Sequence, residues 1–371
     1  MTMAETRSYF PGRGIWKRIE PKQAGFDPDH LQFAVTYAIE SEIKWPQDMK
    51  VIIGFIDRPP FNIPLGPVKE RGQATGLVVK NGYQVASWGD TERADMTFSA
   101  TKSFISILIG LAVDRGLIKS VDDLVIDYVR HDSFDTTQNR KITWKHLLQQ
   151  TSEWEGELFG IPDTVDHNRS VQGGADRTVK KGEKRALHTP GSYWEYNDVR
   201  VNALALAALY VFKEPLPRVL AREIMQPVGA SDTWEWHAYK NAEVTIEGKN
   251  MYSVPGGAHW GGGLFISTSD LARAGYLMLR RGNWNGQQLI SEDWIDQSLT
   301  ACQLNPGYGY MWWLNIEKRM FGSASDKAFA AVGAGGNVVF MDPQYDLVIV
   351  TRWTQNHGNV IDRIVRSLSN S

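Results

Sequence analysis

The sequence has a single cysteine, Cys302, among its 371 residues. This excludes an intrachain disulfide framework and any zinc or iron–sulfur site built from several cysteines. Lysine and arginine together number 40 against 42 acidic residues, so the chain lacks the basic excess of proteins that bind nucleic acid. The eight histidines form no His-x-x-x-His or similar helical pair, which argues against a metal site.

Long apolar runs are also missing. The longest, residues 104–113, is half the length of about 20 residues that a membrane-spanning helix needs, and we expect it to be a buried helix instead. The N-terminal residues 1–14 lack the apolar core of a secretory signal. We therefore expect a soluble, cytoplasmic, globular protein, unless a leader was removed before this sequence begins.

Apolar segments near both ends of the chain predict one antiparallel sheet. Residues 75–80 and 83–89 flank Asn81-Gly82, the strongest short-range signal for a β-hairpin. A second pair of strand-like segments, 337–341 and 346–353, lies near the C-terminus. Helices are expected over 27–44, where apolar residues have helical spacing, and from about residue 360 to the end.

The middle of the chain has a different pattern. Apolar residues at helical spacing predict helices over 144–150, 199–212 and 217–225, separated by polar loops. We interpret residues 117–250 as a helical domain inserted into an α/β domain formed by 1–116 and 251–371, with the active site in the cleft between them.

The most informative motif is Ser99-x-x-Lys102, directly before the apolar stretch 104–113. Helical spacing places the two side chains one turn apart on one face. Burial and the positive end of the helix dipole both favour the neutral amine, which can accept a proton from the serine hydroxyl. The Ser99 N–H can also stabilise an oxyanion. A second match, Ser41-x-x-Lys44, ends an amphipathic helix with nothing to bury its lysine.

Two further segments carry candidate residues. Tyr196 lies where a polar loop enters the apolar helix 199–212. A nearby lysine ammonium would favour its phenolate form, which can act as a general base. Tyr239 in a polar loop is an alternative from the residues alone. The glycine-rich segment 331–337 leads into a strand, whereas a nucleotide-binding loop opens a helix. It therefore favours an edge that another backbone can approach closely.

In order and spacing these segments resemble the serine β-lactamase-like superfamily, which includes class C β-lactamases, penicillin-binding DD-peptidases, family VIII esterases and 6-aminohexanoate-dimer hydrolase. The resemblance extends over nearly the whole chain. Besides the Ser99 motif it includes ITWKHLLQQTSEWEG at 142–156, PGSYWEYND at 190–198 and HWGGGLFISTSDLARAGYLML at 259–279. It implies a β-lactamase/transpeptidase-like α+β fold, and it favours Ser99 and Tyr196 over the alternative matches.

Carried over to this chain, the resemblance implies that Ser99 is the acylated nucleophile and that Lys102 accepts its proton. Tyr196 would be the shared acid and base, which protonates the leaving group and then activates the deacylating water. The oxyanion would lie between the N–H groups of Ser99 and Ala334, the residue after Gly333. The expected activity is hydrolysis of a small ester or amide through an acyl-enzyme, without a metal or an organic cofactor.

Two departures from the family pattern bear on the chemistry. Where the family often has Tyr-x-Asn, this chain has Tyr196-Asn197-Asp198. If Asp198 takes the asparagine position, it pairs with Lys102, stabilises the ammonium form and leaves more of the proton transfer to Tyr196. Where β-lactamases and peptidases carry Lys-Thr-Gly or His-Thr-Gly, this chain has Ala-Val-Gly at 331–333. The motif of 6-aminohexanoate-dimer hydrolase is also apolar at this position. We therefore expect poor turnover of β-lactams.

Several other residues are candidates for the wall of the site. His259 could line the cleft, although a structural role in its loop is the favoured interpretation. The acidic segment 153–157 is expected to be a solvated loop, and residues 308–315 are expected to be a strand. Five tryptophans fall in or near the segments that should frame the cleft, which suggests an apolar or aromatic acyl or leaving group: Trp154, Trp194, Trp260, Trp312 and Trp313.

Two alternative functions stay open. One is β-lactamase or DD-peptidase-like activity, and the other is a non-catalytic binding or sensor module on the same fold. The set of Ser99, Lys102 and Tyr196 argues against the module, whereas Asp198 leaves it open. As a partner we expect a small-molecule ester or amide, without nucleic acid or membrane. The sequence does not decide whether the protein forms a homo-oligomer.

Overall fold

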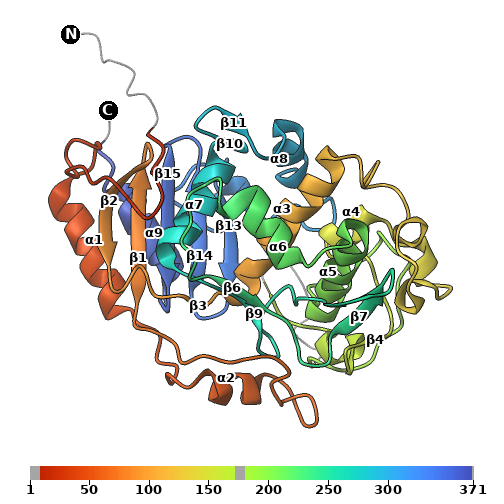
Figure 1. Cartoon of the computed structure of the whole chain (residues 1–371). Helices are drawn as coiled ribbons and strands as arrows, with labels where there is room; N and C mark the ends of the chain where they lie inside the picture. The colour runs from red at the N-terminus through yellow and green to blue at the C-terminus, as the bar shows by residue number, and fades with distance from the viewer. Residues whose placement is uncertain (1–8, 172–179, 370–371) are drawn as a thin grey trace.

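The computed structural model describes residues 9–171 and 180–369. Residues 1–8, on which part of the expectation about a leader rests, lie outside the described residues. The framework is a six-stranded antiparallel sheet in the order β12-β13-β14-β15-β1-β2 (Figure 1). The prediction of one antiparallel sheet built from both ends of the chain is confirmed. The strands are β1 Thr75–Lys80, β2 Tyr83–Trp88, β12 Trp313–Leu314, β13 Phe329–Gly333, β14 Asn337–Asp342 and β15 Leu347–Arg352.

The hairpin of β1 and β2 turns at the predicted pair. Asn81 and Gly82 have φ angles of +52° and +85°, which is the left-handed backbone that the favoured two-residue hairpin turns require. On its other side β1 pairs with β15, and Val78 lies opposite Ile349. The two ends of the chain therefore meet inside one sheet.

Successive residues of a strand point to opposite faces of the sheet. In β14, Val338 and Phe340 belong to a core with α1 and α9, whereas Val339 and Met341 belong to the core that contains α3 and α7. The sheet is consequently buried on both faces, with α1 and α9 in one outer layer (Figure 1). These helices are α1 Pro28–Glu40, α3 Thr101–Asp114, α7 Thr268–Leu279 and α9 His357–Arg366.

Helix α3 lies between the six-stranded sheet and the helical part of the molecule and packs against both. It is buried over residues 101–112, as its apolar sequence predicts, and it packs against both β13 and α5 (Asp198–Phe212). It ends just before Gly116, which adopts a φ angle of +67°. The 3₁₀ turn η1 (Phe98–Ala100) leads directly into α3, so Ser99 lies at the N-terminal end of this central helix.

The middle of the chain, predicted to be an all-helical insertion over 117–250, contains the expected helices and also two short hairpins, β4–β5 and β7–β8. Strand β6 pairs with β9 in a three-stranded sheet of order β3-β9-β6. The middle is thus joined to the rest by strand pairing as well as by helix packing. The elements are α4 Trp144–Leu148, α6 Leu216–Leu220, β3 Asp95–Met96, β4 Glu157–Leu158, β5 Ile161–Pro162, β6 Glu235–His237, β7 Glu243–Ile246, β8 Lys249–Tyr252 and β9 Gly263–Ile266.

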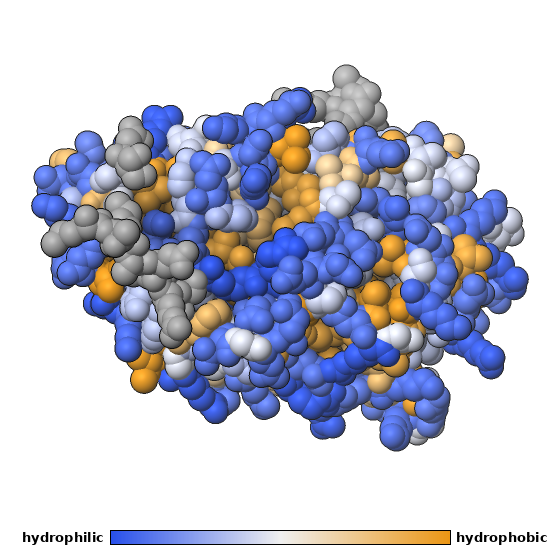
Figure 2. Space-filling view, turned by 90° about the horizontal axis from the view of Figure 1, so that it is seen from above, coloured by the Kyte–Doolittle hydropathy of each residue, from blue (hydrophilic) through white to orange (hydrophobic). Residues whose placement is uncertain are grey.

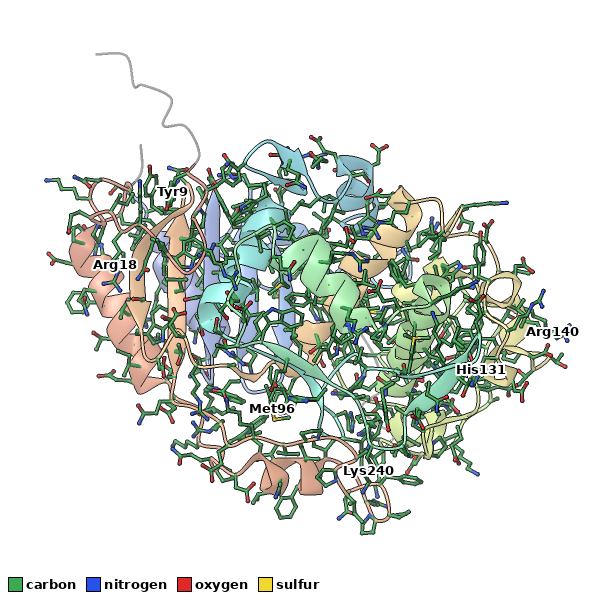
Figure 3. All side chains as sticks on the ribbon, viewed as in Figure 1. Tyr9, Arg18, Met96, His131, Arg140 and Lys240 are labelled. Carbon is green, nitrogen blue, oxygen red and sulfur yellow. The ribbon has the colours of Figure 1, made fainter. Side chains whose placement is uncertain are left out.

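A separate N-terminal segment that begins with α2 (Met49–Ile56) runs below the lower end of the sheet in Figure 1. Met49 and Ile53 of this helix form a small core with Met96 and Phe98. Met96, labelled in Figure 3, lies between the sheet and α2. The remaining elements are the hairpin β10 (Asn283–Trp284) and β11 (Gln287–Gln288), and helix α8 (Glu292–Ser298).

The surface seen from above is mostly hydrophilic, and apolar residues show on it only in separate patches (Figure 2). Among residues 9–171 and 180–369, no helix has the length and apolar content that crossing a bilayer would require.

Candidate active site

The side chains of Ser99 and Lys102 are in contact at the start of α3. Lys102 Nζ donates a hydrogen bond to Ser99 Oγ at 2.9 Å. Ser99 is partly exposed, whereas Lys102 is 1% exposed. The hydroxyl can therefore meet a substrate, while the amine that touches it is kept from bulk water.

The residue before the serine has an unusual backbone. Phe98 has a φ angle of +49°, a left-handed conformation that costs a bulky residue of order 1–3 kcal/mol. Its ring makes edge contacts with Trp45 and Trp353, with centroids 6.3 Å away in both cases. This packing holds the turn that presents Ser99. No pattern in the sequence marks Phe98 for this role.

Asp198 connects Lys102 to a buried cluster of charges. Its carboxylate is ion-paired with Lys102 Nζ, and it also contacts Arg169 at 2.6 Å and His259 Nδ1 at 2.8 Å. The predicted pairing of Asp198 with Lys102 is thus confirmed. Burial opposes ionisation, but the Arg169 and Lys102 cations hold the pKa of Asp198 well below its usual range. Asp198 is therefore a carboxylate at neutral pH and is ion-paired with Lys102.

Tyr196 lies next to the same charges. Lys102 Nζ is 4.9 Å and the Arg169 guanidinium carbon 5.2 Å from the centroid of the Tyr196 ring. The ring is stacked on Trp313 at 5.8 Å and makes a tilted contact with Trp194 at 6.3 Å. This aromatic wall thus holds the Tyr196 ring against Lys102.

Two glycines let other segments approach the nucleophile. A Cβ on Gly333, at the end of β13, would lie 2.1 Å from the Thr97 carbonyl oxygen and 3.2 Å from Ser99 N. A Cβ on Gly257 would lie 3.1 Å from Lys102 Nζ and 3.7 Å from Ser99 Oγ. Gly333 belongs to the glycine-rich segment that was predicted to allow a close approach, whereas Gly257 was not predicted, although it is one of two adjacent glycines just before the 259–279 segment.

The turn after β13 is tied to the nucleophile segment by side chains that the sequence did not indicate. Asn337 Nδ2 donates to the carbonyl of Ala334 at 2.6 Å, and Asn337 Oδ1 accepts from Arg352 Nε at 2.8 Å. The other end of the buried Arg352 guanidinium donates to the Met96 carbonyl at 2.8 Å. Arg352 therefore connects the turn that carries Ala334 to the strand that leads into Ser99.

Replacement of Gly333 with alanine should disturb this contact. Because the new methyl group would overlap the Thr97 carbonyl, β13 or the nucleophile segment must move. We expect a loss of about 1–3 kcal/mol in the free energy of unfolding and about a 100-fold loss in esterase kcat/KM. Gly322→Ala is the matched control, since a Cβ there has no neighbour within 4 Å. Wild-type values for Gly333→Ala would contradict the close approach.

Other residues that were predicted to lie in the site instead cap a helix or pack in the interior of the protein. Asn197 caps α5 by accepting hydrogen bonds from backbone N–H groups of its first turn. Trp154 is fully buried, and its indole N–H donates to a backbone carbonyl at 2.7 Å. Trp260 is also fully buried and stacks on His259 at 4.1 Å, while Trp312 packs edge-on against Phe329. Of the five tryptophans, Trp194 and Trp313 are thus the ones in contact with Tyr196.

The expectation of a solvated loop at 153–157 is wrong for Glu153, which is fully buried. Its carboxylate accepts hydrogen bonds from Arg185 at 2.7 Å and from Arg200 at 2.6 Å. Burial opposes ionisation, but the hydrogen bonds from Arg185 and the charge of Arg200 lower the pKa of Glu153 to about 2. Glu153 is therefore part of a buried ion-pair network at the start of α5.

Three buried side chains, Asp166, Asp198 and His259, offer donor atoms within 4.8 Å of one another. Such a group could hold a metal ion in principle. Here, however, the two carboxylates already contact three side-chain cations, which more than compensate their negative charge without an ion. The cations are Lys102, Arg169 and Lys181.

Comparison with known proteins identifies the family and the fold. The beta-lactamase family model matches residues 73–368. The 6-aminohexanoate-dimer hydrolase of Paenarthrobacter ureafaciens is 23% identical over 299 residues, which are 74% of this chain and 69% of that protein. The solved structure of a putative 6-aminohexanoate-dimer hydrolase from Bacillus anthracis has a TM-score of 0.56 and 17% identity, and the alignment covers 98% of this chain and 88% of that one.

A second solved structure, of EstCE1, described as a hydrolase with promiscuous acyltransferase activity, has a TM-score of 0.59 and 15% identity. That alignment covers 92% of this chain and 99% of EstCE1. At these identities the structural likeness shows the fold. Because the family match spans well over half of the sequence, the chain belongs to the beta-lactamase family of serine hydrolases.

Proposed function

We propose that this protein hydrolyses a small ester or amide through an acyl-enzyme on Ser99. The observation that carries the proposal is the hydrogen bond of 2.9 Å between the partly exposed Ser99 hydroxyl and the buried Lys102 amine. Ser99 Oγ attacks the carbonyl carbon of the substrate, and the bond from this carbon to the leaving oxygen or nitrogen breaks. Water then cleaves the acyl-serine ester and restores the hydroxyl.

The charges around Lys102 bear on the route of the proton. Asp198 stabilises Lys102 as an ammonium, and an ammonium cannot accept the serine proton. We therefore assign the larger share of the proton transfer to Tyr196, whose ring lies against Lys102. In this mechanism the Tyr196 phenolate takes the proton of Ser99, the resulting phenol passes this proton to the leaving group, and the phenolate so restored takes a proton from the deacylating water.

The oxyanion is assigned to the backbone N–H groups of Ser99 and Ala334. Support comes from Gly333, because its α-carbon approaches Ser99 N so closely that a Cβ would lie 3.2 Å from it. Ala334 follows directly and is exposed, and its carbonyl group is held by Asn337. Two N–H donors aimed at one carbonyl oxygen stabilise the charge that develops in the tetrahedral intermediate.

The end of β13 that lies beside Ser99 favours a substrate that has no carboxylate group at this position. Ala331 is buried and Val332 is half-buried, so this part of β13 provides neither an ammonium nor a hydroxyl group. Trp194 and Trp313 in the aromatic wall favour an apolar acyl or leaving group. These features favour a small ester or amide over a β-lactam or a peptide terminus.

The experiment that tests this proposal traps the intermediate. The protein is mixed with excess p-nitrophenyl butyrate, quenched in acid after milliseconds to seconds, and analysed by intact-mass and peptide-mass spectrometry. We expect a burst of p-nitrophenol and a butyryl group on the peptide that contains Ser99. Turnover with no butyryl group on Ser99, or no turnover of either this ester or a p-nitroanilide, would refute the proposal.

A chromogenic cephalosporin tests the substrate class. Because β13 offers no cation or hydroxyl for a carboxylate, we expect kcat/KM for the cephalosporin to be at least about 100-fold below that for p-nitrophenyl butyrate. The two substrates are compared with the same enzyme preparation, by absorbance. Comparable values would instead favour the β-lactamase alternative.

A further inference from the structure

The segment 57–67 lies outside the residues matched by the family, which begin at residue 73, yet it packs directly on the glycine-rich turn beside the nucleophile. The N–H groups of Leu65 and Gly66 donate to the carbonyl of Trp260 at 2.8 and 3.1 Å. Gly262 N donates to the Pro67 carbonyl at 2.8 Å. This is contact between backbones, because a Cβ on Gly66 would lie 2.6 Å from Gly262 N.

One side chain of this segment reaches the buried charge cluster. Asp57 Oδ2 lies 2.7 Å from His259 Nε2, while the other ring nitrogen, Nδ1, lies 2.8 Å from Asp198. Asp198 is ion-paired with Lys102, and Lys102 donates to Ser99. An unbroken chain of polar contacts thus runs from Asp57 to the nucleophile. Apart from Ser99, the four residues of this chain of contacts have side chains that are at most 4% exposed.

The geometry at His259 indicates its protonation state. Each ring nitrogen lies at hydrogen-bond distance from a carboxylate oxygen. The carboxylate oxygens, at 2.7 and 2.8 Å, are closer to these nitrogens than the Arg169 and Lys181 nitrogens, which are both 3.3 Å away. Because an ionised carboxylate can only accept, this geometry favours the imidazolium form, which has two N–H groups. Burial alone would lower the pKa of His259, but the charge of Asp166 and the hydrogen bonds to Asp198 and Asp57 raise it. The charged groups facing the ring are Asp57, Asp166, Asp198, Arg169 and Lys181.

From this arrangement we infer that Asp57 is a positioning residue of the active site. It fixes His259 as a donor to Asp198, so that Asp198 holds Lys102 against Ser99. Asp57 does not touch the reacting atoms. The inference rests on the proposed function for its activity readout, whereas the contact of Asp57 with His259 can be measured separately.

Asp57→Asn tests the inference, because it keeps the shape of the side chain and removes its charge. With p-nitrophenyl butyrate we expect kcat to fall about tenfold, as for residues that orient a catalytic group, with KM within about twofold. Loss of the carboxylate destabilises the imidazolium, so the pKa of His259 falls and any limb of the pH–rate profile that reports on it moves to lower pH. Asp48→Asn is the matched control. It removes the same charge from the cap of α2 and should behave as the wild type.

Histidine ring signals in proton NMR, assigned with His259→Gln, report on the contact without turnover. The inference is supported if His259 titrates at lower pH in Asp57→Asn than in the wild type and in Asp48→Asn, together with the selective loss of kcat. An unchanged His259 titration, or kinetic constants equal to those of Asp48→Asn, would overturn it. If the wild-type protein hydrolyses no ester, the proposed function fails, and the NMR titration still decides the role of Asp57 toward His259.

Discussion

Replacement of Ser99 with alanine should lower kcat/KM for p-nitrophenyl butyrate by about 10⁶-fold, the scale of loss when a serine hydrolase loses its nucleophile. The residual rate comes from the oxyanion donors and from binding, which alanine leaves in place. The fold should be unaffected, because Ser99 is partly exposed and Lys102 keeps its ion pair with Asp198. We expect the free energy of unfolding to change by no more than about 0.5 kcal/mol.

The control for this prediction is the second Ser-x-x-Lys match. Ser41 is the C-cap of α1, and neither Ser41 nor Lys44 contacts the charge cluster around Lys102 in the described residues. Ser41→Ala should therefore keep wild-type kinetics. Full activity in Ser99→Ala, or a loss in Ser41→Ala comparable to that expected for Ser99→Ala, would contradict the assignment of the nucleophile.

The parts of the fold that could be predicted are those with local signals. The Asn81-Gly82 turn, the buried helix α3 and the strand pairs near both ends all follow from residues close together in sequence. The strand expected over 308–315 shows the limit of this approach. It is confined to Trp313–Leu314 because Met311 has a φ angle of +63°, and the Met311 carbonyl is bound by a hydroxyl of α3, Ser103 Oγ, at 2.7 Å.

The parts of the site that could not be predicted depend on contacts between distant segments. His259 and Asp57 are 202 residues apart, and Arg352 and Met96 are 256 apart. No periodicity or motif links such pairs, and the N-terminal segment that supplies Asp57 lies outside the family match. Glu153 was misjudged for the same reason, since acidic residues in a polar segment usually face water.

Replacement of Lys102 with methionine should affect both catalysis and stability. We expect kcat/KM for the ester to fall about 10³-fold, because the group that orients the Ser99 hydroxyl is lost. Methionine fills a similar volume, but Asp198 is then a buried carboxylate that has lost one of its partners. Since Arg169 and His259 still contact Asp198, we expect a loss of about 2 kcal/mol in the free energy of unfolding, less than for a fully orphaned charge.

The double variant Lys102→Met/Asp198→Asn separates the two effects. Removal of the Asp198 charge relieves the unpaired carboxylate, so the double variant should be more stable than the sum of the single changes predicts, by about 1–2 kcal/mol. Its activity should stay as low as that of Lys102→Met, because the ammonium beside Ser99 is still absent. Urea unfolding followed by tryptophan fluorescence measures the first quantity, and ester turnover the second. Additive losses of stability would mean that the Lys102–Asp198 pair contributes no coupling, and recovery of activity in the double variant would mean that Lys102 serves only to neutralise Asp198.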